Sequence, residues 1–170
     1  SEYDTILVER AGRVARVSFN RPEKLNSFNV TQRREFVRAA QEVNADREIW
    51  VVVLTGAGRA FCAGADLSDT EESGFSGAEG VEDQLNAEYK PGVLAIHHAR
   101  KPWVAAVNGP CAGISYSYAM ACDLVLMAES SYLYQPFVGI GLVPDGGATW
   151  LLPHLIGSKR AYELMALGEK

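Results

Sequence analysis

The sequence has few of the features that mark secreted, membrane-spanning or nucleic-acid-binding proteins. Its three cysteines form neither a paired framework nor a CxxC metal motif, which predicts reduced, buried thiols. No run of about 18 apolar residues occurs, so no membrane span is expected. The first residues lack a basic segment followed by an apolar stretch, so we expect a cytoplasmic protein. No motif predicts a metal or a redox cofactor. The cysteines are Cys62, Cys111 and Cys122.

Basic residues are also in the minority. There are 16 Lys and Arg against 21 Asp and Glu, which gives a net charge of -5. Because non-specific nucleic-acid binding needs a basic face, this balance argues against it. A local cluster of cations could still serve a polyphosphate ligand. The length of 170 residues fits one domain, spanning residues 1–170.

The apolar pattern that is present predicts an α/β fold. Residues 5–9 and 14–19 alternate as two strands paired around Gly12. Residues 29–45 have helical spacing, with Asn29 as N-cap. Continuous apolar runs then predict three buried parallel strands, separated by helices. The runs are residues 50–54, 103–107 and 124–127, and the helices lie at about 84–99 and 115–122.

Two other regions are less regular. Residues 67–92 are rich in Gly, Ser and acids, which predicts a solvated loop with a short surface helix, or else a lid over the substrate. Residues 158–170 read as a final helix capped by Ser158, whose apolar face nothing covers. We therefore expect the chain to be truncated at its C-terminus.

Two of the predicted strands are followed by small-residue turns. One leads into FCAGADL at 61–67 and the other is NGPCAGIS at 108–115, where a helix begins. Small residues let a ligand approach the backbone, and the N–H groups at a helix start are unsatisfied. Such groups can hold a developing oxyanion at the carboxyl edge of a parallel sheet. Each turn taken alone is equally compatible with a tight strand-to-helix connection.

Four motifs in order resemble those of the crotonase (enoyl-CoA hydratase/isomerase) superfamily. The first is RPEKLNS at 21–27 and the second is FCAGADL with its AGAD core. The third runs from the NG turn at 108–109 to the CD pair at 122–123. The fourth is GLVPDGG at 141–147, followed by a Leu-Pro pair and Gly157. The resemblance covers essentially the whole chain.

The resemblance implies a β-β-α spiral core, usually assembled as a homotrimer or hexamer, with its C-terminal helical part missing here. It implies an acyl-CoA substrate, with coenzyme A as part of the substrate and no separate cofactor. By position, the N–H groups of Ala65 and Ile114 would hold the thioester oxygen. Gly113 or Ser115 could replace Ile114, because a β-branched residue disfavours positive φ.

Residues that would contact the substrate follow from the same motifs. The coenzyme A moiety would lie near Lys24 and Leu25 and near Ala63, and Asp66 and Gly113 belong to the same two motifs. Lys24 and Arg59 are also suitable phosphate partners because of their charge. Either cation could equally be an ordinary exposed side chain.

The sequence departs from the hydratases at the two glutamates that place and ionise water in that group. The matching positions are Ser117 and Phe137, and neither side chain can carry out acid/base chemistry. Classical hydration of an enoyl-CoA is therefore doubtful.

One acid remains in a suitable position. Asp145 matches the place where several isomerases of the superfamily carry an Asp or Glu base, and the segment resembles the phenylacetyl-CoA-type isomerases. Near the apolar residues Phe137, Val143 and Ile114, its carboxyl should have a raised pKa. The structural alternative is that Asp145 only caps a helix starting at Gly146.

Three functional hypotheses remain. The leading one is an acyl-CoA isomerase of fatty acid metabolism that shifts a double bond through an enolate, with Asp145 as acid and base. A hydratase-like activity, or a dehalogenase or hydrolase with Asp145 as nucleophile, is an enzymatic alternative. The third is a catalytically impaired acyl-CoA binder. The acyl group itself is not predicted.

Overall fold

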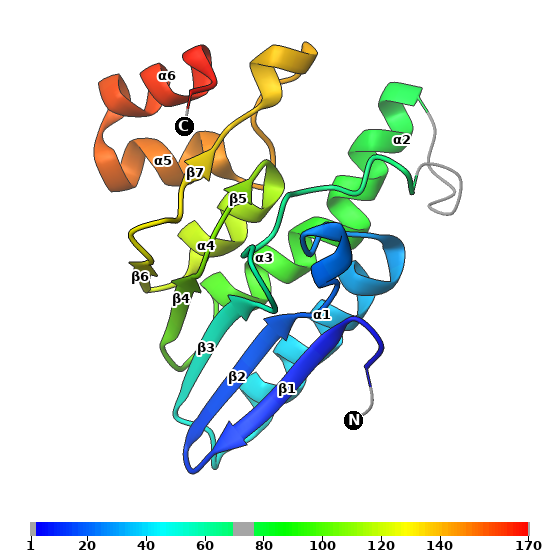
Figure 1. Cartoon of the computed structure of the whole chain (residues 1–170), viewed down its shortest axis with the longest axis vertical. Helices are drawn as coiled ribbons and strands as arrows, with labels where there is room; N and C mark the ends of the chain where they lie inside the picture. The colour runs from blue at the N-terminus through cyan, green and yellow to red at the C-terminus, as the bar shows by residue number, and fades with distance from the viewer. Residues whose placement is uncertain (1–2, 70–76, 170) are drawn as a thin grey trace.

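The computed structural model of the protein describes residues 3–69 and 77–169 (Figure 1). A five-stranded sheet has the order β1-β2-β3-β4-β6, and a small second sheet pairs β5 with β7. The strands are β1 (Ile6–Ala11), β2 (Val14–Phe19), β3 (Val51–Gly56), β4 (Trp103–Val107), β5 (Cys111–Ala112), β6 (Leu124–Met127) and β7 (Leu133–Tyr134).

Helices follow the strands in the order that the sequence predicts. They are α1 (Val30–Ala45), α2 (Gly77–Gln84), a π-helical segment (Leu85–Tyr89), α3 (Lys90–His97), α4 (Ile114–Ala121), α5 (Ala148–Ile156) and α6 (Ser158–Leu167). Two short 3-10 helices occupy Pro22–Lys24 and Phe137–Ile140. Strands alternating with helices give the α/β class that the apolar pattern predicts.

The pairing of the main sheet confirms the predicted strands. β1 and β2 form an antiparallel hairpin around Gly12, which has a φ of 59°. β2, β3, β4 and β6 then run parallel, so their carboxyl ends share one edge of the sheet. The loops that carry the two small-residue turns leave β3 and β4 at this edge (Figure 1).

The core is an aromatic cluster between the sheet and its helices. Phe19 of β2 packs edge-on against Phe28 with 5.1 Å between ring centroids, and Phe28 lies 4.9 Å from Tyr118 of α4. Helix α1 faces this cluster with its predicted apolar side, and Asn29 accepts the Gln32 N–H at 2.9 Å as its N-cap. The predicted start and buried face of α1 are both confirmed.

A buried ion pair ties α1 to the π-helical segment. Nε of Arg33 lies 2.7 Å from Oε2 of Glu88, and both side chains are at least 95% buried. Asp69 also reaches Arg33, at 3.5 Å, and its carboxylate accepts the Val30 N–H. The pair fixes the end of the acidic segment, of which residues 70–76 lie outside the described part.

Three sequence predictions are wrong in detail. β6 is not buried on both faces, because Leu124 and Leu126 are more than 60% exposed; it is also an edge strand, with only β4 as neighbour. Ser158 does not cap the last helix, since Gly157 is its N-cap and makes no side-chain bond. That helix ends at Leu167, followed by Gly168 in the left-handed conformation, and not at residue 170.

Among the described residues, no helix combines the length and hydropathy of a membrane span.

Candidate active site

The two small-residue turns lie against each other. Cys62 and Cys111 form an isolated parallel bridge, and the Ala112 N–H donates to the Cys62 carbonyl at 3.0 Å. The AGAD turn itself touches the second turn at Gly64, where an added Cβ would lie 2.8 Å from the Ala112 carbonyl oxygen. Only glycine fits there, so the AGAD turn can reach the second turn only with glycine at this position.

This contact joins residues one and two positions before the N–H groups that the motifs single out, those of Ala65 and Ile114. Ile114 is the first residue of α4, so its N–H has no partner inside the helix. In the described part of the chain, neither this N–H nor that of Ala65 donates one of the backbone hydrogen bonds outside helices and strands. The Gly113 N–H is already used, because it donates to the Tyr134 carbonyl at 3.0 Å. The geometry therefore favours Ile114 over Gly113.

The conformational demand of the second turn falls on glycine and not on isoleucine. Gly113 has φ 58° and ψ -135°, a region that L-residues with a Cβ avoid. Ile114 has no positive φ and begins the helix normally. The β-branched side chain at this position is therefore compatible with a donor N–H.

Ser115, near the start of α4, forms hydrogen bonds with both turns. Its Oγ lies 2.7 Å from the Cys62 carbonyl oxygen and 2.7 Å from that of Ala112, and the residue is fully buried. One hydroxyl hydrogen shared between two carbonyls links the chain after β3 to the chain after β4. The sequence pattern did not identify this role, although Ser115 stands inside the motif.

The N-terminal motif supports the Ala65 turn from the other side. The Leu25 carbonyl accepts the Ala63 N–H at 3.0 Å, and the Phe28 N–H donates to the Gly64 carbonyl at 2.8 Å. Leu25 and Asn26 have positive φ, which is uncommon outside glycine. The buried Asn26 amide stabilises this geometry by donating to the carbonyls of Ala57, Ala60 and Phe61.

The three charged residues that the sequence predicts to contact the substrate differ in their solvent exposure and in their partners. Lys24 is exposed at the surface of this loop, as is Arg59 on the neighbouring one. Asp66 pairs with Arg21 at 3.0 Å. Burial raises the pKa of Asp66, but hydrogen bonds from Ser68 and Arg21 outweigh it and hold the pKa below its ordinary value. Asp66 is thus held by the protein itself, and the two cations face solvent.

The turn that carries Asp145 packs directly on α4. A Cβ added to Gly146 would lie 2.9 Å from Cγ1 of Ile114 and 2.9 Å from Oγ of Ser117. The Ser117 hydroxyl donates to the Asp145 carbonyl at 3.0 Å. Asp145 therefore lies beside the helix start that contributes Ile114.

Asp145 does not cap the following helix. The N-cap of α5 is Gly147, in the left-handed conformation, and no side chain caps it. In the described part of the chain, the buried Oδ1 of Asp145 has no hydrogen-bond partner. The structural alternative raised by the sequence is therefore wrong, and the carboxyl has no structural bond at this oxygen.

The environment of this carboxyl changes its acidity. Burial raises the pKa of Asp145 from 3.8 to about 6, with a hydrogen bond from its own backbone acting in the opposite direction. The predicted direction is confirmed, but one of the predicted causes is not. Val143 is 78% exposed and contributes little to the burial, whereas Phe137 and Ile114 are both buried.

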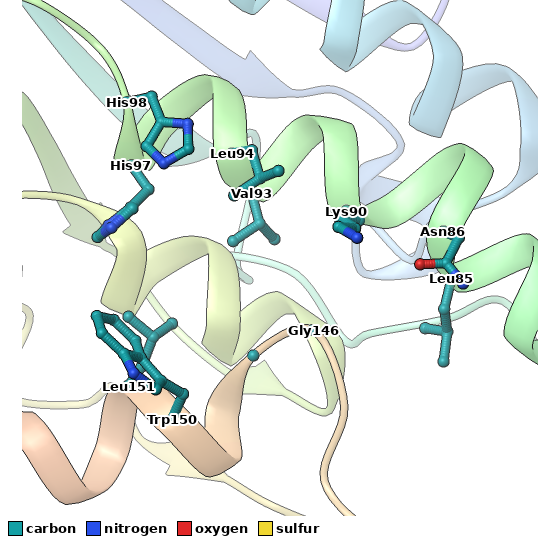
Figure 2. Close-up of a pocket in the computed structure, with 11 residues that line it drawn as sticks. Leu85, Asn86, Lys90, Val93, Leu94, His97, His98, Gly146, Trp150 and Leu151 are labelled. Atoms are coloured by element: carbon teal, nitrogen blue, oxygen red, sulfur yellow. The ribbon is translucent and has the colours of Figure 1, made fainter.

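A cavity of about 500 Å³ runs past this turn between α3 and α5. Figure 2 shows Gly146 between the two helices, with Val93 and Lys90 on one side and Trp150 on the other. His97 meets the Trp150 ring edge-on, at 5.7 Å between centroids.

Two residues of this cavity wall, His97 and His98, were not singled out from the sequence. Both are exposed, and both line the cavity. Their spacing from Asn86, Lys90 and Val93 is helical, which is a signal that could have grouped them. Across the described residues, no group of three or more His, Cys, Asp or Glu side chains could hold a metal ion.

Comparison with known proteins identifies the family and the fold of the chain. The chain is 39% identical over 168 residues to a probable enoyl-CoA hydratase of Rhodobacter capsulatus, covering 99% of this chain and 63% of that protein. It is 38% identical over 157 residues to the 1,2-epoxyphenylacetyl-CoA isomerase of Escherichia coli, covering 92% and 60%. A crystal structure of an enoyl-CoA hydratase from Bacillus anthracis superposes with a TM-score of 0.90 at 32% identity, covering 98% and 64%.

The chain thus spans less than two thirds of the length of these relatives. The solved structures share its mixed α/β crotonase fold, as the sequence motifs imply. The sequence profile described as "Enoyl-CoA hydratase/isomerase" matches residues 9–170. The protein belongs to the enoyl-CoA hydratase/isomerase family.

Proposed function

We propose that the protein is an acyl-CoA isomerase that moves a double bond by proton transfer, with Asp145 as acid and base. The observation that carries the proposal is the half-buried Asp145, whose buried Oδ1 has no hydrogen-bond partner in the described structure and whose neighbour Gly146 packs against Ile114. Its pKa of about 6 suits a group that must both take and return a proton near neutral pH.

In this mechanism the N–H groups of Ala65 and Ile114 donate to the thioester oxygen. Polarising that carbonyl acidifies the adjacent carbon, and Asp145 removes a proton from it. The electron pair moves into an extended enolate whose charge rests on the held oxygen. Asp145 then returns the proton to the γ carbon, which leaves the double bond in its new position. One donor of such a hole is worth about 3–4 kcal/mol in the transition state.

Two side chains support isomerisation over hydration, because they stand at the positions where the resemblance assigns the hydratase glutamates. Ser117 is fully buried and its hydroxyl is bonded to the Asp145 carbonyl, and Phe137 is 6% exposed. Neither can place and ionise a water molecule. Most of the similar proteins carry the name hydratase and one carries the name isomerase, so a hydratase-like reaction is the second candidate.

Exchange of α-protons into deuterated water tests the proposal with a panel of acyl-CoA thioesters. Wild type should catalyse exchange, and Asp145→Asn should lose it while still binding the thioester. Asp83→Asn, an exposed acid-to-amide change on α2, is the matched control and should exchange normally. Full exchange by Asp145→Asn would refute the role of Asp145.

The same experiment separates the alternatives. Tight thioester binding by wild type without any exchange would identify a binding protein instead of an enzyme. Net hydration of an enoyl-CoA would support the second candidate. An adduct trapped on Asp145 would favour the hydrolase or dehalogenase mechanism. We further expect a homotrimer or hexamer in the cytoplasm, which light scattering and fractionation can check.

A further inference from the structure

Ser117 makes an unusual hydrogen bond for a serine inside a helix. Such a hydroxyl commonly bonds a carbonyl one turn earlier in its own helix. Here the Oγ leaves α4 and donates to the Asp145 carbonyl at 3.0 Å, across 28 positions of sequence. In the described structure no other hydrogen bond joins α4 to residues 141–147. Ser117 is also fully buried, so water cannot replace the bond without rearrangement.

The backbone of Gly146 packs closely against the same part of α4. Its φ is 59°, and an added Cβ would lie 2.9 Å from Cβ and Oγ of Ser117 and from Cγ1 of Ile114. A distance under 3.0 Å is a clash that something must move to relieve. The turn therefore approaches the helix this closely only because residue 146 has no side chain and residue 117 has a short one.

These contacts connect the two halves of the proposed reaction centre. Ile114 and Ser117 are three residues apart, so they lie on one face of α4 about one turn from each other. Ile114 provides an N–H group for the oxyanion, and Ser117 holds the residue that provides the carboxyl. A single helical turn thus sets the separation between the held oxygen and the acid/base.

We propose that Ser117 is a positioning residue, whose hydroxyl fixes the Asp145 backbone beside the oxyanion site and keeps its carboxyl in the buried position required for proton transfer. The proposal rests on the proposed function, since it presupposes that Asp145 moves the proton. Ser117 itself need not touch the substrate. Its length matters as well as its hydroxyl, because Gly146 occupies the space that a longer side chain would need.

Removal of the Ser117 hydroxyl should change the acid limb of the profile of kcat against pH. The titratable groups that face Asp145 are Tyr118 from α4 and Tyr89 from the π-helical segment. Burial raises the pKa of Tyr89 to about 12 and holds the pKa of Tyr118 well above its ordinary value, so both stay neutral in the working range. His97, His98 and Lys90 line the adjoining cavity and are present in wild type and variant alike.

The test compares Ser117→Ala, Ser117→Cys and Ser117→Thr by isomerisation kinetics from about pH 4 to pH 9. The alanine variant and the near-isosteric cysteine variant lose the strong donor, and threonine keeps it. Ser131→Ala is the matched control, because it removes a hydroxyl that donates to a carbonyl, at 2.6 Å, in a loop outside the site. Circular dichroism verifies that each variant folds.

We expect Ser117→Ala and Ser117→Cys to lower kcat roughly fivefold to tenfold with KM nearly unchanged, the effect of one net hydrogen bond. The midpoint of the acid limb should fall below about pH 6, because a loosened turn admits water to the carboxyl. Ser117→Thr should restore kcat and the midpoint, and Ser131→Ala should match wild type.

Two results would overturn the inference. One is a kcat and an acid midpoint in Ser117→Ala that equal those of wild type. The other is wild-type behaviour in Ser117→Cys, which would leave packing as the only role of residue 117. Asp145→Asn separates this failure from failure of the proposed function. If Asp145→Asn is inactive and Ser117→Ala is unchanged, only the positioning role is wrong.

Discussion

Replacement of Asp145 by Asn should change the pH dependence of stability as well as abolish proton transfer. The pKa of this carboxyl rises from 3.8 to about 6 on folding because burial disfavours the charged form. Below both values the group is protonated in the folded and unfolded chains, and it contributes nothing. As pH rises from about 4 to 6, the unfolded chain loses the proton first, so the folded state is penalised. The penalty is complete above about pH 6.

The size of the penalty follows from the two pKa values. At 1.36 kcal/mol per pH unit, a rise from 3.8 to about 6 corresponds to about 3 kcal/mol at neutral pH, of which about 2.5 kcal/mol develops between about pH 4 and pH 8. Asparagine has nearly the same shape but does not titrate. Any fixed cost of the buried amide therefore cancels when the same variant is compared at two pH values.

The assay is urea unfolding of wild type and Asp145→Asn at both pH values, analysed as a two-state transition. The unfolding free energy of the variant relative to wild type should rise by about 2.5 kcal/mol between the lower and the higher pH. All other titrating groups are common to the two proteins and drop out of the difference. Equal pH dependence in both proteins would show that Asp145 titrates normally, and the acid/base proposal would lose its electrostatic basis.

Three further substitutions or treatments test other parts of the structure. Gly64→Ala should lower kcat about a hundredfold with the fold retained, because its Cβ would lie 2.8 Å from the Ala112 carbonyl and separate the two donor turns. Unchanged kinetics would show that activity does not depend on the close contact between Gly64 and Ala112. Glu88→Gln should lower the unfolding free energy measured in urea by about 3 kcal/mol, since it leaves the buried Arg33 guanidinium without its nearest carboxylate. The control Glu9→Gln, which breaks an exposed ion pair, should lower it by less than about 1 kcal/mol. A thiol reagent should label no cysteine in the native protein and three in denaturant, because burial raises the thiol pKa at Cys62, Cys111 and Cys122; native labelling would refute their burial.

The strands and first helix could be predicted because local pattern determines them. Alternation identifies the hairpin around Gly12, and apolar runs identify β3 and β4. The capping of α1 by Asn29 follows from its side chain alone. β6 was misjudged because an apolar run does not reveal whether other elements cover both faces of a strand. That information belongs to the packing of the whole fold, which no local segment contains.

The candidate site was predictable in its parts but not in its assembly. The motifs identify Ala65, Ile114 and Asp145 one at a time, and their order in the sequence says nothing of the contact between Gly64 and Ala112. The hydroxyls of Ser115 and Ser117 were not recognised as links, because a serine in a helix has the same pattern whether it faces its own helix or another loop. Only tertiary packing distinguishes the two cases.

The replacement of a longer acidic side chain at position 117 is therefore more than the loss of a catalytic group. Serine there provides the bond to the Asp145 carbonyl, and its short side chain admits the Gly146 backbone. A glutamate at 117 would need the space that this turn fills, so it could return only if the turn and its carboxyl moved away. In this packing, a long acidic side chain at 117 and the turn that carries Asp145 therefore compete for the same space. If Asp145 is the acid/base, as we propose, this competition for space is a physical reason to expect proton transfer and not addition of water.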